Sequence, residues 1–175
     1  MKYDELCDNI NNLFKKDSLD SEKLDQTKYA YVYNIVETLS TQAGIPIPGL
    51  RYLSTQKPRA TSSGMRAPGF IVVTQGALDF YTPYELHGIL AHEIGHLVAQ
   101  DSKRQSLLRK PLPGNDLRDF YHQNEYAADK FSTELLHAPK PLIAALEKFK
   151  DFSKINDINH PSAEDRIARL KTPVL

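Results

Sequence analysis

Apolar residues recur at helical spacing in two segments near the N-terminus. In the first segment, Tyr3 to about Lys16, they are Leu6, Ile10, Leu13 and Phe14. In the second, Asp25 to Ala43, they are Tyr29, Val32, Tyr33, Val36 and Leu39. Side chains three or four residues apart lie on one face of an α-helix, and Gly44 followed by Pro46 ends a helix. The pattern therefore predicts two amphipathic helices.

Between Ile45 and Asp79 the pattern changes to short alternating and β-branched runs separated by Gly and Pro. It predicts strands at Phe70–Thr74 and Leu50–Leu53, with turns between them. Arg59–Ser63 is a third candidate strand, and its shortage of apolar side chains favours the edge of a sheet.

The next helix has a well-marked beginning. Thr82 suits the N-cap, Pro83 suits the first helical position, and Glu85 completes a capping box. The helix is expected to be largely buried because it carries many apolar residues, namely Leu86, Leu90, Ile94, Leu97 and Val98. Gly95 inside it costs about 1 kcal/mol relative to Ala, and close approach of another backbone is one reason to accept that cost.

The last third of the chain predicts three more helices. The first covers about Leu117–His137, and its apolar stripe is Leu117, Phe120, Tyr121, Ala128, Phe131 and Leu135. The second covers Leu142–Phe152, after Pro139 and Pro141. Ser162 and Asp165 mark the beginning of a third, short helix. The loop Lys110–Asp116 precedes them, and the stretch Ser106–Asp116 is either a lid over a site or a passive connector.

The composition is that of an ordinary globular protein. The 22 basic and 22 acidic residues balance, which gives no electrostatic reason to expect nucleic acid or an anionic membrane as a partner. The one cysteine, Cys7, excludes an intramolecular disulfide. The N-terminus lacks the apolar core of a signal peptide, and the longest apolar stretch, Gly88–Ala99, is too short to cross a bilayer. We expect a soluble protein, cytoplasmic or otherwise, with no membrane span.

The segment His92–His96 reads HEIGH. Residues four apart on a helix point the same way, so His92 and His96 can bind one metal ion with their imidazoles. Glu93 would lie beside them, within reach of a metal-bound water, as in the H-E-x-x-H signature of zinc hydrolases. The alternative is a pair of structural histidines, although burying such polar groups without partners or metal is costly.

A catalytic zinc site needs a third protein ligand and an open fourth position. Glu125 and Asp129 lie one turn apart on a later predicted helix. Glu125 could complete the ligand set, and Asp129 could accept a hydrogen bond from a ligand histidine. His122 is the rival third ligand. The alternative reading of this helix is an acidic face in solvent.

Three motifs in this order resemble the CAAX prenyl protease and HtpX family of zinc metallopeptidases. They are HEIGH, the ExxAD of Glu125–Asp129, and HPSAEDRIARL from His160. The segment GFIVVTQGALD resembles the strand and turn before the active-site helix of that family, and the similarity spans roughly Ile45–Leu170.

The resemblance implies zinc ligands at His92, His96 and Glu125 and a catalytic base at Glu93. It also implies that Asp129 supports a ligand histidine. His160 would help stabilise the oxyanion, and Arg166 would contact Asp129 or a neighbouring carboxylate. His87 and His137 are expected to take no part.

Two departures from the family pattern affect the expectations. Many members are embedded in membranes, whereas no membrane-spanning segment is visible here. The edge strand of the family usually contains Asn-Ala, and this chain has RATSSGM instead, which leaves substrate preference open. We expect an extended peptide to pair with this strand, through Ala60, Thr61, Ser62 and Ser63.

These expectations combine into one α+β, zincin-like domain over residues 1–175, mostly helical with a small, partly antiparallel sheet. N-terminal helices would occupy residues 1–44 and a catalytic core residues 45–175. The expected function is that of a metalloendopeptidase with one Zn²⁺ per chain, acting on peptides or unfolded protein segments. The alternatives are a regulatory protease of the ImmA type, a peptide-binding module without catalysis, and a helical scaffold without metal.

Overall fold

The computed structural model describes residues 20–64, 68–99, 114–150 and 160–172, with side chains of the third range from Arg118 onward. Its elements in chain order are β1 (Glu22–Lys23), α2 (Ala30–Ala43), β2 (Gly49–Leu53), β3 (Ala60–Ser63), β4 (Phe70–Thr74), α3 (Gln75–Phe80), α4 (Pro83–Ala99), α6 (Gly114–Leu136), α7 (Lys140–Phe149) and α8 (Ala163–Lys171). The helix expected at 3–16, Cys7, and positions 106–113 of the possible lid lie outside the described residues.

The four strands form one mixed sheet in the order β1-β2-β4-β3. The central pair β2–β4 is parallel, and the outer strands β1 and β3 pair antiparallel with β2 and β4. In the β3–β4 ladder, Ala60 lies opposite Val73 and Ser63 opposite Phe70. The expectation that the polar segment before Gly64 forms an edge strand is thus confirmed.

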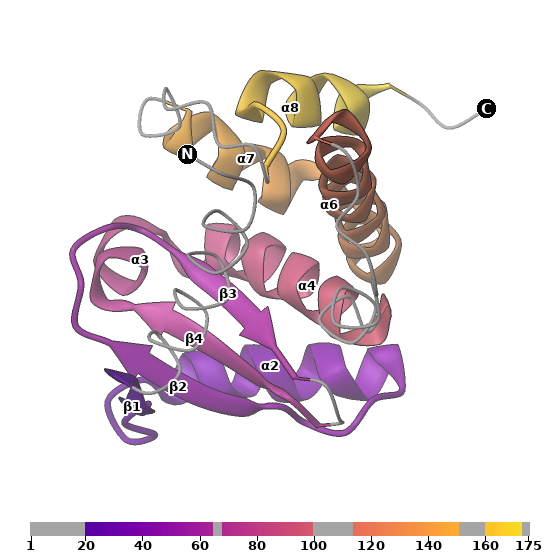
Figure 1. Ribbon diagram of the computed structural model, residues 1–175. Helices are drawn as coiled ribbons and strands as arrows, with labels where there is room; N and C mark the ends of the chain where they lie inside the picture. The colour runs from indigo at the N-terminus through magenta and orange to yellow at the C-terminus, as the bar shows by residue number, and fades with distance from the viewer. Residues whose placement is uncertain (1–19, 65–67, 100–113, 151–159, 173–175) are drawn as a thin grey trace.

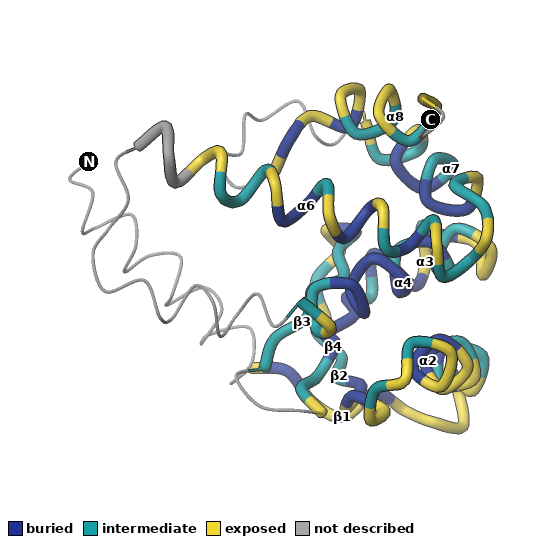
Figure 2. The backbone as a smooth tube through the Cα atoms, turned by 90° about the vertical axis from the view of Figure 1, so that its right-hand side faces the viewer, coloured by how far each residue is buried: buried dark blue, intermediate teal, exposed yellow. Residues whose placement is uncertain are grey.

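Helices α2 and α4 lie on one face of the sheet, and α6, α7 and α8 lie on the other side of α4 (Figures 1 and 2). The apolar core lies between the sheet and its two helices, where the following side chains are buried: Leu50, Ile71 and Val73 from the strands, Val32, Val36 and Leu39 from α2, and Leu86, Leu90 and Ile94 from α4. The α+β, mostly helical fold expected from the sequence is confirmed. The division of the domain at residue 45 stays a prediction.

The second predicted helix begins later than expected, at Ala30 instead of Asp25. Oδ1 of Asp25 accepts hydrogen bonds from the backbone N–H groups of Thr27 and Lys28, at 2.8 and 2.9 Å. A side chain that bonds the backbone two and three residues ahead stabilises a turn, so the regular helix starts after it.

Two short elements were not predicted, β1 and α3. Residues 75–80 were expected to form a turn, and they form α3. Its N-cap is Thr74, the last residue of β4, whose hydroxyl accepts a hydrogen bond from the N–H of Ala77. Thr74 has a high propensity for strands, and this hid its second role as a helix cap.

The capping box predicted for α4 is confirmed in both directions. The N–H of Thr82 donates to the carboxylate of Glu85 over 2.7 Å, and the N–H of Glu85 donates to the hydroxyl of Thr82 over 3.3 Å. The N-cap at Ser162 of α8 is confirmed too, since its hydroxyl accepts from the N–H of Asp165.

Two later helices begin earlier than predicted. Helix α6 begins at Gly114, so residues 114–116 of the expected loop are helical, and α7 begins at Lys140 instead of Leu142. Pro141 fits inside the first turn of α7, where a missing N–H costs nothing. No helix in the described ranges is long and apolar enough to cross a lipid bilayer.

Candidate metal centre and active site

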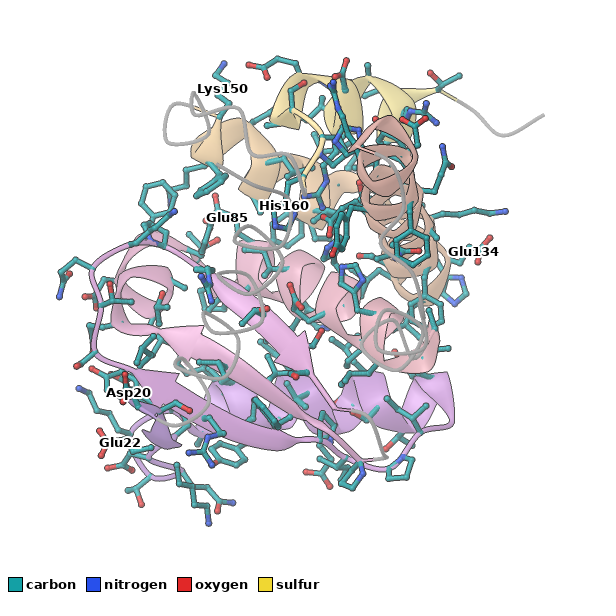
Figure 3. All side chains as sticks on the ribbon, in the orientation of Figure 1. Asp20, Glu22, Glu85, Glu134, Lys150 and His160 are labelled. Carbon is teal, nitrogen blue, oxygen red and sulfur yellow. The ribbon has the colours of Figure 1, made fainter. Side chains whose placement is uncertain are left out.

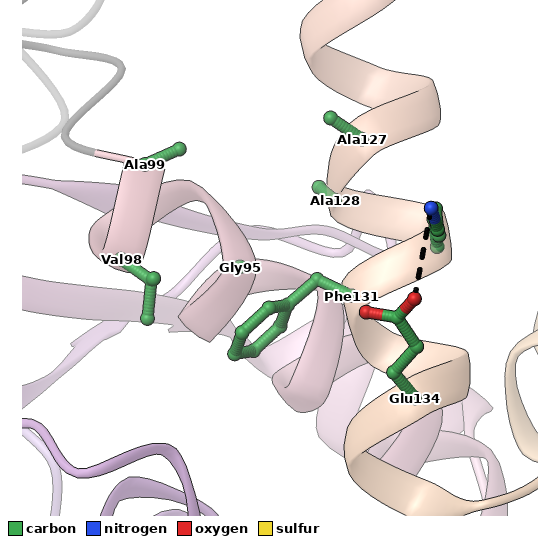
Figure 4. A pocket seen from close by; sticks show the side chains of 8 residues that line it. Gly95, Val98, Ala99, Ala127, Ala128, Phe131 and Glu134 are labelled. Atoms are coloured by element: carbon green, nitrogen blue, oxygen red, sulfur yellow. Dashed lines mark ion pairs between the residues drawn. The ribbon is translucent and has the colours of Figure 1, made fainter.

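The site is built where α4 crosses α6 (Figure 4). A Cβ placed on Gly95 of α4 would lie 3.1 Å from Cα of Ala128 and 3.3 Å from its carbonyl oxygen on α6. The backbone approach expected from a glycine in this buried helix is therefore confirmed. It brings the carboxylates of α6 within reach of the histidines of α4.

The three predicted zinc ligands meet at this crossing. Nε2 of His92 lies 3.1 Å from Nε2 of His96. The two carboxylate oxygens of Glu125 lie 3.2 Å from Nε2 of His96 and 3.5 Å from Nε2 of His92. One ligand atom from each residue falls within a group no wider than 4.8 Å. His122, the rival third ligand, is not in this group, and neither are His87 and His137.

The spacing of these atoms fits a tetrahedral ion. With bonds of about 2.0–2.1 Å, neighbouring ligands of a tetrahedral zinc lie roughly 3.3–3.4 Å apart. The two imidazole nitrogens, 3.1 Å apart, are close to that value, and so are the contacts of 3.2 and 3.5 Å that the two oxygens of Glu125 make with one nitrogen each. Oε2 of Glu125 is buried and makes no hydrogen bond within the described residues. This oxygen lies within ion-pair distance of Arg166 and His160. Two imidazole nitrogens and a carboxylate are donors that zinc accepts in catalytic sites, so the three side chains fit a zinc site.

Asp129 orients the first of these histidines. Its Oδ1 lies 2.8 Å from Nδ1 of His92. An ionised carboxylate can only accept, so Nδ1 carries the hydrogen and Nε2 presents a lone pair to the site. Burial alone would raise the pKa of Asp129, but the guanidinium of Arg166 and the imidazole of His92 together lower it below its ordinary value, and the carboxylate stays ionised.

Arg166 of α8 joins the two carboxylates of α6. Its Nε donates to Oδ2 of Asp129 over 2.9 Å, its NH2 donates to Oδ1 of the same carboxylate, and its NH1 lies 3.3 Å from Oε2 of Glu125. The contact expected from the sequence is confirmed. The catalytic role expected of Arg166 stays a prediction, because these contacts hold ligands in place and show no contact with a substrate.

Glu93 is also buried, with 7% of its surface exposed. Its Oε2 accepts a hydrogen bond of 2.8 Å from the hydroxyl of Ser62 on β3. This contact was not predicted, because the two residues are 31 positions apart and no motif links them. The role of Glu93 as the base stays a prediction.

His160 lies at the rim of the site, between α4 and the helices above it (Figure 3). Its Nδ1 is 3.2 Å from Oε2 of Glu125, and 56% of its side chain is exposed. It is thus close to the ligand group and open to solvent, as an oxyanion donor would need to be. That role also stays a prediction.

The candidate substrate strand lies beside the site. Ala60, Thr61, Ser62 and Ser63 form β3, and Ser62 reaches Glu93 from it. Among the strands of the described ranges, β3 has a neighbour on one side only. Pairing of a peptide with its other side stays a prediction.

The comparisons with known proteins agree with this site. The model of peptidase family M48 matches residues 26–113, half of the chain, including the HEIGH segment. An HtpX protease homologue from Dictyoglomus thermophilum is 28% identical over 82% of this chain and 69% of its own length. A homologue from Dictyoglomus turgidum is 30% identical over 75% of this chain and 58% of its own length. A shorter match, 41% identical over 78 residues, is to the homologue from Pyrococcus abyssi.

The fold resembles that of a solved structure, Ste24p from S. mikatae. The two superpose with a TM-score of 0.60 and 17% identity, over 80% of this chain and 49% of that one. Glu125, Asp129, His160 and Arg166 lie after the segment that the family model matches, yet the structure brings them to the HEIGH histidines. The chain therefore belongs to peptidase family M48 and carries a metallopeptidase domain similar to that of the HtpX homologues.

Proposed function

We propose that this domain is a zinc-dependent endopeptidase that cleaves extended peptides or unfolded protein segments, with Glu93 as the general base. The observation that carries the proposal is that one ligand atom each of His92, His96 and Glu125 lie within 4.8 Å of one another. Glu93 follows His92 in the chain. Two imidazoles and one carboxylate are the donor set of several catalytic zinc sites, which keep the fourth position open.

His92, His96 and Glu125 would hold the zinc ion. A zinc ion there would supply Lewis-acid chemistry, polarising the peptide carbonyl and making water acidic enough to lose a proton near neutral pH. Asp129 fixes the hydrogen of His92 on Nδ1, and Arg166 holds both Asp129 and Glu125. These contacts keep the ligand side chains in one orientation while the peptide is hydrolysed.

Glu93 performs the proton transfer. Its carboxylate accepts one proton from the attacking water as the water oxygen bonds to the carbonyl carbon. The same carboxylate then gives this proton to the amide nitrogen as the C–N bond breaks, so one water is consumed and an acid and an amine are formed. The burial of Glu93 supports this role. A carboxylate that is shielded from bulk water is poorly hydrated, so it can accept the proton of the attacking water without first losing a hydration shell.

His160 and β3 complete the proposal. His160 is exposed at the rim, where its imidazole can donate to the negative charge that develops on the carbonyl oxygen. The edge strand β3 can add an extended peptide as a further strand by main-chain hydrogen bonds. Because such bonds do not depend on side chains, this mode suits unfolded segments of varied sequence.

The test is the isosteric change Glu93→Gln. It removes the base and leaves the three ligands, so we expect zinc content to stay at one per chain and cleavage of fluorescein-labelled casein to be lost. Glu134→Gln is the matched control, because Glu134 lies on the outer side of α6 (Figure 3), 64% exposed, and pairs with Lys130. Normal cleavage by Glu93→Gln would refute the proposed mechanism. A zinc-loaded wild-type chain that binds casein without cleaving it would indicate a peptide-binding module instead.

A further inference from the structure

Ser62 contacts the candidate base from the sheet. Its hydroxyl donates to Oε2 of Glu93 over 2.8 Å. Ser62 lies opposite Ile71 in the antiparallel ladder, and residues that lie opposite each other share a face of the sheet. Ile71 belongs to the core that α4 covers, so the side chain of Ser62 also points toward α4.

The backbone N–H and C=O groups of Ser62 lie in the plane of the sheet and face away from β4. The N–H of Thr74 donates to the carbonyl of Arg59 over 3.0 Å, so Arg59 and Thr74 form a hydrogen-bonded pair. Hydrogen-bonded and non-hydrogen-bonded pairs alternate along an antiparallel ladder. Ala60 and Ser62 are therefore in non-hydrogen-bonded pairs, and their N–H and C=O groups face away from β4. Thr61 and Ser63 instead direct these groups toward β4.

Ser62 therefore contacts Glu93 through its side chain and faces away from β4 with its backbone groups. We propose that Ser62 is a positioning residue that couples peptide binding to the orientation of Glu93. Its N–H and C=O pair with the added peptide strand, while its hydroxyl holds Oε2 of Glu93 and leaves Oε1 for the proton of water. The inference rests on the proposed function and adds a residue to it. A hydroxyl that donates to a carboxylate forms a charge-assisted bond, which is stronger than a neutral one.

The coupling has a physical basis in the edge position of β3. An edge strand is held by hydrogen bonds on one side only, and a peptide added on the other side restricts it further. Ser62 then has its backbone fixed on both sides, so its hydroxyl holds the carboxylate in one orientation. Loss of the hydroxyl should therefore slow the chemical step more than it weakens peptide binding.

The experiment compares Ser62→Ala, Ser62→Thr and Thr41→Ala in zinc-loaded chains, with a quenched fluorescent peptide as substrate. Ser62→Ala should lower kcat roughly 10-fold, the order expected for one hydrogen bond to a charged group, with KM changed less than about twofold and zinc content unchanged. Ser62→Thr keeps the hydroxyl and should retain most of the wild-type kcat. Thr41→Ala is the control, since the hydroxyl of Thr41 lies on the exposed side of α2 and donates to the carbonyl of Glu37.

The outcomes separate this inference from the proposed function. Cleavage by the wild-type chain together with an unchanged kcat in Ser62→Ala would overturn the role of Ser62 alone. A fall in zinc content that matches the fall in kcat, or a Thr variant as slow as the Ala variant, would also overturn it. Absence of cleavage by the wild-type chain would overturn the proposed function and this inference with it.

Discussion

The carboxylate of Asp129 lies 2.8 Å from Nδ1 of His92, on the side of the imidazole away from the ligand group. Arg166 donates two hydrogen bonds to the same carboxylate. The three side chains come from α6, α4 and α8, so the orientation of His92, a proposed zinc ligand, depends on the packing of three helices.

The change Asp129→Asn tests this orientation. It keeps the shape of the side chain but removes the charge that holds Arg166 and the hydrogen on Nδ1 of His92. We expect zinc affinity to fall about 10- to 100-fold, measured by competition with a chromogenic chelator. Asp79→Asn serves as the control, because Asp79 is exposed and accepts a hydrogen bond from Gln75. If Asp129→Asn and the wild-type chain bound zinc with equal affinity, Asp129 would stabilise the fold without orienting His92.

His160→Ala separates binding of the transition state from binding of the metal. His160 is at the rim and is not one of the three ligands. We expect kcat on the quenched peptide to fall about 100-fold, as for loss of an oxyanion donor, with zinc content unchanged. His137→Ala is the control from the end of α6. A zinc content that falls in step with kcat would make His160 a structural residue of the metal site.

Gly95→Ala tests whether the close crossing of α4 and α6 sets the ligand geometry. Ala is favoured over Gly in a helix by about 1 kcal/mol, but its Cβ would press on Ala128 at 3.1 Å and on Phe131 at 3.2 Å. We expect α6 to move outward by a few tenths of an ångström and zinc affinity to fall, while thermal stability of the metal-free chain changes little.

Gly88→Ala is the comparison on the same helix. A Cβ there would collide with the backbone of Pro141 and Leu142 at the start of α7. This variant should lower thermal stability markedly. If Gly95→Ala lost stability as Gly88→Ala does, or bound zinc as tightly as wild type, the crossing would not be what sets the ligand geometry.

Glu85 makes the stability of α4 depend on pH. Burial alone would raise its pKa, but the N–H of Thr82 and the ammonium of Lys148 lower it below the ordinary value. A pKa that is lower in the folded state stabilises the fold at neutral pH, and this contribution is lost as pH falls through the folded-state pKa. Glu85→Gln should lower the free energy of unfolding by about 1 kcal/mol at pH 7.

Urea unfolding of Glu85→Gln and wild type at a series of pH values measures this effect. The difference in the free energy of unfolding between the two chains should shrink as pH falls below about 4. At such a pH the carboxyl of Glu85 is protonated in the unfolded chain and becomes protonated in the folded chain as well. Glu134→Gln, on an exposed helix face, should show a smaller difference at every pH. A difference that is constant from pH 7 to pH 3 would contradict the account.

Local features of the chain were predictable from the sequence, since they depend on neighbours along the chain. The capping box of Thr82 and Glu85 and the shared face of His92 and His96 follow from spacing. The edge position of β3 follows from its shortage of apolar side chains. Glu125 and Asp129 were candidates from their spacing on one later helix, and the motif resemblance added His160 and Arg166. The structure brings all four to the same site.

The remaining features depend on contacts between distant segments or on competing local bonds. The hydrogen bond from Ser62 to Glu93 requires the register of β3 on β4 and the position of α4 behind the sheet, and no pattern in the sequence encodes either. The helix after Asp25 was predicted too early because the carboxylate of Asp25 bonds the backbone of a turn. The short helix α3 was missed because Thr74 ends a strand and caps a helix at once.

The central claim is that Glu125 completes a zinc site with His92 and His96, and its most direct test is the zinc affinity of Glu125→Gln against that of Glu134→Gln. Chelator competition should show one tightly bound zinc in wild type and in Glu134→Gln, and at least about 100-fold weaker binding in Glu125→Gln, because a neutral amide replaces an anionic ligand. Zinc bound equally tightly by both variants would contradict the account.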